Sequence, residues 1–284
     1  MILVADSGST KCDWVLTDTD GQYIHKTKTE GINPLLFSED NILKIINKTD
    51  FMNRKNDLIK DIHFYGAGCG TNESKQKIKD LLKSVFKNTD HISVEEDIIA
   101  AVHATTQDPG IICILGTGAN CCYYDGTKVI QKSPALGYLL ADEGSGNYLG
   151  KELIKDYFLD KMPIDLAISF KQEFLNDLDQ LLKKLYSTSY PNTYLATYAK
   201  FVFQNRGHQY AEELLHKGIS KFITTQLSQY KKELSEHPVH FVGSVAYYSQ
   251  DIIKQVLDEY GYRVKSFIKN PIDHLIHYTI NQKV

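Results

Sequence analysis

Short apolar runs alternate with amphipathic segments along the first hundred residues. The apolar run Ile2–Ala5 ends at a glycine turn, and Cys12, Trp14 and Leu16 then alternate with polar residues, a pattern typical of a second strand. A turn at Asp20-Gly21 leads into a third strand, which completes a meander. The spacing of apolar residues next predicts a helix after Ser38, a strand at Ile62–Tyr65, a helix at Glu73–Phe86, a strand at Ile92–Val94 and a helix at Asp97–Thr105.

The same order of strands and turns then begins again. The apolar run Ile111–Leu115 ends at a second glycine turn, and Asn120–Tyr124, a second Asp-Gly turn and Lys128–Gln131 follow. Gly116 follows Gly8 by 108 residues, and Asp125 follows Asp20 by 105. The matching offsets predict a duplicated α/β half, with one domain at 1–106 and a second at 107–284.

A long helical region interrupts the second half. Residues 145–234 carry Tyr, Leu and Phe at helical spacing, with a break at Ser187–Pro191, and we interpret them as an insertion. The remaining pattern predicts a strand at Val239–Val242, a helix at Val245–Tyr260, a strand at Arg263–Ile268 and a closing helix at Ile272–Tyr278. This last helix, within about 271–284, is a candidate for returning to the first domain.

Composition narrows the class of protein. The 284 residues suit about two domains, and 42% hydrophobic with 24% charged residues is typical of a globular protein. A net charge of −3 argues against nucleic acid or an anionic membrane as the main partner. No run reaches the ~20 apolar residues of a membrane span, and the N-terminus lacks the features of a secretion signal, so we expect a cytoplasmic protein. Five cysteines without CxxC spacing indicate neither a disulfide framework nor a zinc site.

The two glycine turns are candidates for binding phosphate. Glycine lets backbone N–H groups approach an anion closely. Neither turn has the spacing of a P-loop, and both lead into another strand rather than a helix. A single turn of this kind is most often just a tight hairpin, but two at matched positions favour phosphate held between two β-hairpins.

Three motifs in this order resemble a known superfamily. Asp6-Ser7-Gly8-Ser9-Thr10-Lys11 is similar to the first phosphate motif of the sugar kinase and actin superfamily, Gly116-Thr117-Gly118-Ala119-Asn120 to its second, and Phe241-Val242-Gly243-Ser244-Val245 to its adenosine motif. Over its length the chain resembles the BadF/BadG/BcrA/BcrD group, which includes N-acetylglucosamine kinases. The resemblance implies two ribonuclease H-like domains, the duplicated actin-like ATPase fold, with a helical insertion in the second, closing over ATP and a sugar.

The resemblance also implies site residues. Phosphate and nucleotide contacts would come from Ser7, Gly8, Ser9, Thr10, Thr117, Gly118, Gly243 and Ser244. Sugar contacts would come from Asn33, Gly68, Asn120 and Asp142, and Asp97 would face the hydroxyl to be phosphorylated. Ser244 and His274 depart from the usual pattern, which leaves details of nucleotide preference open.

Each carboxylate also has a structural interpretation. Asp6 beside a phosphate turn suits Mg²⁺, which prefers oxygen ligands, but Asp also forms turns at strand ends. Asp97 and Asp142 both precede helical segments, where a carboxylate caps a helix and interacts favourably with its dipole. Lys11 either neutralises phosphate or is a solvated strand residue, and the sequence favours neither.

We therefore expect ATP-dependent phosphorylation of an amino sugar, N-acetylglucosamine to its 6-phosphate, with ATP and Mg²⁺. Two alternatives remain open: an ATPase that activates a partner enzyme through an iron–sulfur cluster, and a non-catalytic sugar sensor. The expected partner is a small sugar, without nucleic acid or membrane, and a homodimer is compatible with the sequence.

Overall fold

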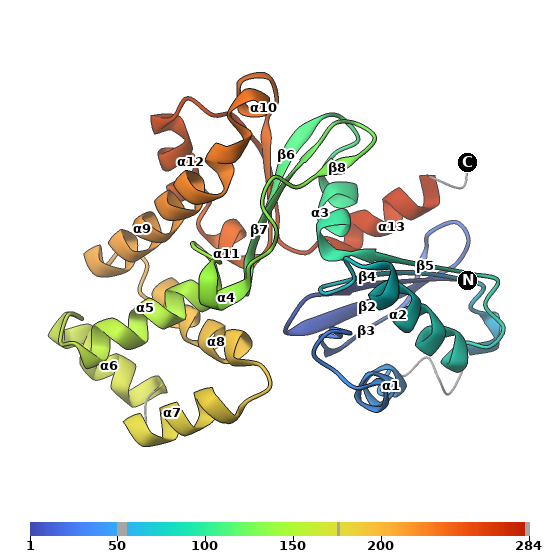
Figure 1. The fold of residues 1–284 in the computed structure, drawn as a ribbon, viewed down its shortest axis with the longest axis horizontal. Coiled ribbons are helices and arrows are strands. Elements are labelled where there is room, and N and C mark those ends of the chain that lie inside the picture. The colour runs from blue at the N-terminus through green and yellow to red at the C-terminus, as the bar shows by residue number, and fades with distance from the viewer. Residues whose placement is uncertain (50–55, 175–176, 282–284) are drawn as a thin grey trace. The chain divides into compact units, whose positions relative to one another are not determined.

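The computed structural model describes residues 1–49, 56–174 and 177–281 (Figure 1). The chain divides into two compact units. The first comprises Met1–Gln107 together with Asn270–Val284, and the second comprises Asp108–Lys269. The last residues of the predicted closing segment, 282–284, lie outside the described residues. Each unit is built on one five-stranded sheet.

The sheet of the first unit is mixed. Its strands are β1 (Ile2–Ser7), β2 (Lys11–Thr17), β3 (Tyr23–Glu30), β4 (Asp61–Gly66) and β5 (His91–Glu96), in the order β3-β2-β1-β4-β5. The meander β1-β2-β3 is antiparallel, whereas β1, β4 and β5 run parallel. The carboxyl ends of these three strands therefore meet at one edge of the sheet.

Helices cover both faces of this sheet. They are α1 (Glu39–Asn47), α2 (Asn72–Val85), α3 (Asp97–Thr105) and α13 (Ile272–Asn281), and a short 3₁₀ turn, η2, spans Asn56–Leu58. Figure 1 shows α1 and α2 on one side and α3 with α13 on the other. Alternate strand residues such as Trp14 and Phe64 are buried against Ile42 of α1 and Ile78 of α2, the arrangement that period-2 strands and amphipathic helices produce together.

The sheet of the second unit repeats this topology. Its strands are β6 (Gly110–Leu115), β7 (Ala119–Tyr124), β8 (Val129–Ile130), β9 (Val239–Val242) and β10 (Val264–Ile268), in the order β10-β9-β6-β7-β8. In both units the first strand pairs antiparallel with the second and parallel with the fourth. The predicted α/β class and its duplication are confirmed.

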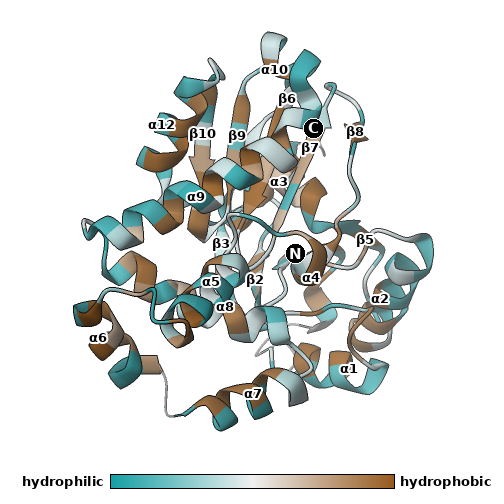
Figure 2. Cartoon of the chain, turned by 60° about the vertical axis from the view of Figure 1, so that its left-hand side comes forward, coloured by the Kyte–Doolittle hydropathy of each residue, from teal (hydrophilic) through white to brown (hydrophobic). Residues whose placement is uncertain are grey.

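A group of helices lies between β8 and β9, as the predicted insertion requires. They are α4 (Gly137–Leu140), α5 (Gly146–Phe158), α6 (Ile164–Phe174), α7 (Leu178–Ser187), α8 (Pro191–Gln204), α9 (Gln209–Thr225), η3 (Leu227–Tyr230) and α10 (Lys231–Glu236). Figure 2 shows β6 in the brown of hydrophobic residues, whereas α9 carries both brown and teal residues. Helix α9 buries residues such as Leu215 and Phe222 against the core of this unit and leaves its polar residues outside.

Two elements differ from the sequence-based expectation. The predicted helix Val245–Tyr260 is two helices, α11 (Ser244–Tyr248) and α12 (Gln250–Glu259), because the backbone at Ser249 leaves helical geometry with ψ of 23°. The predicted strand Lys128–Gln131 shrinks to two residues, since Lys128 belongs to the preceding turn, where its N–H donates to Asp125 Oδ1.

Candidate active site

Three parallel strands bring the predicted residues of the first unit to one edge. Ser7 of β1 pairs in register with Gly66 of β4, and Gly66 pairs with Glu96 of β5. Asp6 precedes Ser7, and Asp97 follows Glu96 as the first residue of α3. Ligands of α/β sheets commonly bind at the carboxyl ends of parallel strands. Residues from three distant parts of the sequence therefore meet where such a ligand is expected.

The first glycine turn, Gly8 to Thr10, joins β1 to β2. Its backbone closes through Gly8 N–H, which donates to Lys11 O at 3.0 Å. The Ser7 hydroxyl is buried and engaged with Ile32: it donates to Ile32 O at 3.1 Å and accepts from Ile32 N–H at 2.7 Å. The side chain of Ser7 thus fixes the neighbouring segment to the turn. Any phosphate contact at this position falls to its backbone or to the turn residues that follow.

Gly31 fits tightly against the same turn. A Cβ atom at this position would lie 2.1 Å from Gly8 O and 2.9 Å from the carbonyl carbon of Ser9. In contrast, a Cβ at Gly8 would have nothing closer than Lys11 O, at 3.9 Å. The glycine required by packing is therefore the one outside the turn, while the turn glycine leaves open space.

Asn33 and Gly68, both predicted to contact sugar, lie together. Gly68 has φ of +81°, and a Cβ atom there would lie 2.2 Å from Asn33 Oδ1. Asn33 Oδ1 accepts from Leu35 N–H at 2.9 Å, which orients the side chain. Within the described part of the chain, the Asn33 Nδ2 group has no hydrogen-bond partner and can donate to a ligand.

Asp97 has the electrostatic character of a base at neutral pH. Burial, followed by repulsion from Glu96, raises its pKa to about 6, and hydrogen bonds from the N–H groups of Ile98 and of Asp97 itself partly oppose this rise. The N-cap of α3 is Glu96, whose side chain makes no capping bond, so Asp97 occupies the first helical position rather than the cap. A carboxylate with this pKa is mostly ionised at pH 7 and accepts a proton readily.

Negative charge accumulates beside the first turn. Burial and then repulsion from Asp13 and Asp97 raise the pKa of Asp6 to about 7, against the opposing effect of Lys11. Asp13, directly opposite Asp6 in the strand pairing, is itself neutralised by Lys11 Nζ at 2.7 Å and Lys28 Nζ at 3.4 Å. Lys11 is thus held in an ion pair with Asp13, and Asp6 forms no ion pair with any of the described residues.

This charge at Asp6 fits a bound cation. Among the described residues, no group of three or more His, Cys, Asp and Glu side chains is arranged to hold a metal. One carboxylate is nevertheless sufficient for Mg²⁺, which is usually bound through one or two carboxylates while waters and substrate phosphates fill its remaining positions. Asp6 is therefore the candidate ligand in this unit.

The second unit also gathers its predicted residues at one sheet edge. The turn between β6 and β7 closes through Gly116 N–H, which donates to Gly118 O at 2.9 Å. Gly243 follows β9 with φ of +112°, and a Cβ there would lie 2.4 Å from Leu115 O, so the start of α11 packs directly against the second turn. This edge brings together Thr117, Gly118, Gly243 and the exposed Ser244.

Asp142, predicted to bind sugar, is bonded to the second turn. It is buried and has φ of 70°, which is unusual for a residue other than glycine. Its Oδ1 accepts from Ala119 N–H at 3.0 Å, and its Oδ2 accepts from Asn147 Nδ2 at 2.7 Å. Burial raises the pKa of this carboxyl, and these hydrogen bonds oppose the rise. A sugar contact at Asp142 has to use the lone pairs that remain.

Asn120 and Asn147 complete the polar residues around this turn. Asn120 Oδ1 accepts from Cys121 N–H at 2.8 Å and from Gln131 Nε2 at 3.3 Å. Asn147, in the first turn of α5, is fully buried and was not predicted from the sequence. Its only sequence signal is a polar residue directly after Ser145-Gly146, in a segment that otherwise resembles the apolar start of a helix.

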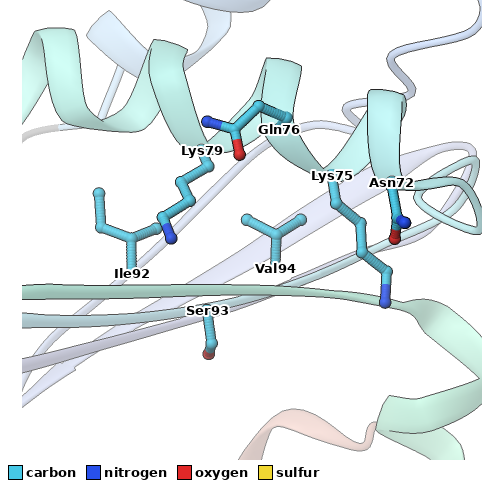
Figure 3. A pocket seen from close by; sticks show the side chains of 7 residues that line it. All are labelled: Asn72, Lys75, Gln76, Lys79, Ile92, Ser93 and Val94. Atoms are coloured by element: carbon cyan, nitrogen blue, oxygen red, sulfur yellow. The ribbon is translucent and has the colours of Figure 1, made fainter.

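A separate hollow of about 320 Å³ lies in the first unit, between α2 and β5 (Figure 3). Figure 3 shows Lys75 and Lys79 reaching from α2, while Ile92 and Val94 point toward that helix and Ser93 points away. The lining residues are Asn72, Lys75, Gln76, Lys79, Ile92, Ser93 and Val94. None of the predicted site residues is among them, so this hollow is distinct from the candidate active site.

Three known proteins are similar to this chain. A solved structure of a candidate N-acetylglucosamine kinase from Porphyromonas gingivalis superposes with a TM-score of 0.93 and 32% identity, covering 100% of both chains. The N-acetyl-D-glucosamine kinase of Dictyostelium discoideum is 26% identical over 194 residues, which cover 63% of this chain and 60% of the relative. The N-acetylmuramic acid/N-acetylglucosamine kinase of Clostridium acetobutylicum is 33% identical over 89 residues, or 31% of this chain and 29% of the relative.

The two curated relatives are therefore matched over less than two thirds of their own length. Within the described residues, no helix is long and apolar enough to cross a membrane. Unlike the matches to the two curated relatives, the match to a known protein family spans almost the whole chain. Residues 5–274, which include both glycine turns, Asp97 and the Gly243 motif, match the BadF/BadG/BcrA/BcrD ATPase family, and the chain belongs to that family.

Proposed function

We propose that this protein transfers the γ-phosphoryl group of ATP to N-acetylglucosamine and produces the 6-phosphate. The observation that carries the proposal is Asp97, a carboxylate of pKa about 6 at the sheet edge where the first glycine turn and the Asn33–Gly68 pair also lie. Membership of an ATPase family supports ATP as the donor. The names of the relatives from Dictyostelium and Clostridium support an amino sugar as the acceptor.

The chemistry needs mainly positioning and charge stabilisation. The backbone N–H groups of the two turns, with Thr10 and Thr117, would hold phosphate oxygens, and Gly243 with Ser244 would contact the adenosine. Asp97 would orient the acceptor hydroxyl and accept its proton as the new bond to the γ-phosphorus forms, while the bond from that phosphorus to the bridging oxygen breaks and ADP leaves. Asp6 would hold Mg²⁺, which neutralises phosphate charge when bound. Asn33 and Asn120 would donate to or accept from sugar hydroxyls and the acetamido group.

The activator alternative fits the cysteines poorly. All five cysteines are free and buried, whereas a bridging iron–sulfur cluster needs thiolates gathered at a surface. Burial also raises the pKa of Cys12 and of Cys121 well above the usual value, which disfavours the thiolate form that binds iron. An iron–sulfur cluster would colour the protein, so a colourless purified protein would count against the activator. The sensor alternative would not require Asp6 and Asp97, and the chain has both.

We expect N-acetylglucosamine to give a kcat/KM at least about 100-fold above that of glucose. A site that hydrogen-bonds the acetamido group leaves buried polar atoms unpaired when glucose binds. The measurement is ADP release from Mg-ATP across a panel of glucose, glucosamine, N-acetylglucosamine and N-acetylmuramic acid, with mass spectrometry of the products. Equal turnover of glucose and N-acetylglucosamine contradicts the acetamido contact, and ADP release without any phosphosugar contradicts the kinase.

Activity should also report the ionisation of Asp97. Its pKa is raised to about 6, and only the ionised form accepts a proton, so the part of the kcat/KM profile that depends on residue 97 should fall about tenfold per pH unit below pH 6 and level off above it. The control is Asp97→Asn, whose residual activity retains any titration of ATP or of Asp6 but not that of residue 97. An inflection near pH 4 in the wild type would contradict the raised pKa of Asp97. The same inflection near pH 6 in both proteins would exclude Asp97 as its source.

A further inference from the structure

We propose that Asn147 is a positioning residue that joins the second glycine turn to Asp142, so that the phosphate and sugar contacts of the second unit form one rigid element. The inference rests on the proposed function for the identity of the two ligands. Asn147 is fully buried in the first turn of α5, which begins at Gly146. Neither the glycine motifs nor the sugar motifs include it.

Both protons of the Asn147 carboxamide are used. Nδ2 donates to Thr117 O at 2.7 Å and to Asp142 Oδ2 at 2.7 Å, which are the two hydrogen bonds that an NH₂ group can donate. The backbone N–H of Asn147 also donates to Thr117 O, at 3.0 Å. One residue therefore holds the middle of the second turn and the carboxylate predicted to contact sugar.

The oxygen of the Asn147 carboxamide, unlike its nitrogen, makes no hydrogen bond to the described residues. Within the described residues, Asn147 Oδ1 is buried and has no hydrogen-bond partner. Rotating the amide by 180° would place this oxygen against two acceptors, Thr117 O and Asp142 Oδ2, so the observed orientation is the only favourable one. A buried acceptor without a partner costs stability. This cost indicates that Asn147 is present to donate its two hydrogen bonds, and not to stabilise α5.

The backbone around Asp142 completes the connection. Asp142 has a φ of 70°, Gly146 N–H donates to Gly116 O at 2.8 Å, and Asp142 Oδ1 accepts from Ala119 N–H at the other end of the turn. Strained backbone of this kind persists when the surrounding contacts determine it, and it concentrates at functional sites. A ligand that moves Asp142 must therefore move the turn as well.

Sugar binding at Asp142 should consequently change the affinity of the second glycine turn for phosphate, and the reverse. If sugar orders Asp142 and phosphate orders the turn, each ligand tightens the binding of its partner by the same factor. Asn147 carries this coupling because it contacts both ends. A purely structural Asn147 would contribute to the melting temperature but not to the affinity for nucleotide or to its dependence on sugar.

The test uses Asn147→Ala, Asn147→Asp and the matched control Asn205→Ala. Asn205 also donates an amide hydrogen bond, to Phe201 O at 2.8 Å, but this bond lies at the C-cap of α8 and does not involve the turn. The full-length proteins are titrated by calorimetry with a non-hydrolysable ATP analogue, with and without N-acetylglucosamine. We expect both Asn147 variants to bind the analogue about tenfold more weakly and to lose its tightening by sugar, and Asn205→Ala to bind as the wild type does.

The outcomes separate this inference from the proposed function. Folded Asn147 variants that bind the analogue as tightly as Asn205→Ala overturn the positioning role. If Asn147→Asp does not fold, because its carboxylate would face that of Asp142, Asn147→Ala alone decides. A wild type that binds the analogue but phosphorylates no sugar contradicts the proposed function, and the analogue affinities of the variants still decide the role of Asn147.

Discussion

Asp97→Asn should lower kcat by about 100- to 10,000-fold while the protein stays folded and still binds ATP, because Asn cannot accept the proton of the acceptor hydroxyl. The structural cost of the change is small. Asp97 stands at the first helical position, where losing its charge costs about 0.3–1 kcal/mol of interaction with the helix dipole. The substitution also removes a carboxylate that is hard to ionise, because burial and the charge of Glu96 both oppose its ionised form. The melting temperature should therefore stay the same or rise.

The matched control for this experiment is Glu95→Gln. Glu95 lies two residues earlier on β5 and pairs with Lys75 at 2.5 Å, outside the proposed machinery. The free energy of unfolding of Glu95→Gln should fall by at most about 1 kcal/mol and its kcat should stay that of the wild type, since partly exposed ion pairs contribute little. A stable Asp97→Asn protein that phosphorylates sugar at a rate near that of the wild type would show that Asp97 serves the helix and not the reaction.

The fold could be predicted from the sequence because its signals are local and repeated. The apolar runs at Ile2–Ala5 and Ile111–Leu115, each followed by a glycine turn, predicted the first strand of each sheet and thereby the duplication. The errors are also local. Hydrophobic spacing continues through Ser249, so the break between α11 and α12 has no signal in the periodicity. The strand predicted to begin at Lys128 begins one residue later, because a hydrogen bond to Asp125 holds Lys128 in the turn.

The site could be predicted only in part because its hydrogen bonds join distant residues. Motifs placed Asn33 and Gly68 in one site, and the structure brings them into contact. Ser7 was assigned to phosphate, yet its hydroxyl bonds to Ile32, 25 residues away. A motif describes which residues stand at a turn but not which partners satisfy their side chains. The bonds from Asn147 to Asp142 and Thr117 belong to the same class and were missed for that reason.

Gly31→Ala should destabilise the folded protein and Gly8→Ala should not, whereas both substitutions should weaken nucleotide binding. At Gly31 a Cβ would lie 2.1 Å from Gly8 O, so the first turn must move, and overpacking of this kind costs about 1–3 kcal/mol. At Gly8 the nearest atom to a Cβ is 3.9 Å away, and the backbone does not adopt a positive φ. Gly8→Ala should therefore melt within a degree or two of the wild type.

Nucleotide binding should suffer in both variants, by different routes. In Gly31→Ala the displaced turn no longer presents its N–H groups correctly. In Gly8→Ala the turn is intact, but the added methyl group occupies the open space through which a phosphate approaches the backbone, and we expect affinity for the ATP analogue to fall at least about tenfold. Thermal unfolding and calorimetric titration of both proteins measure the two effects separately. Because the free protein has room for this methyl group, a weaker affinity of Gly8→Ala would reflect contact between the methyl group and the bound nucleotide. A Gly8→Ala protein with wild-type affinity would show that the first turn does not bind phosphate.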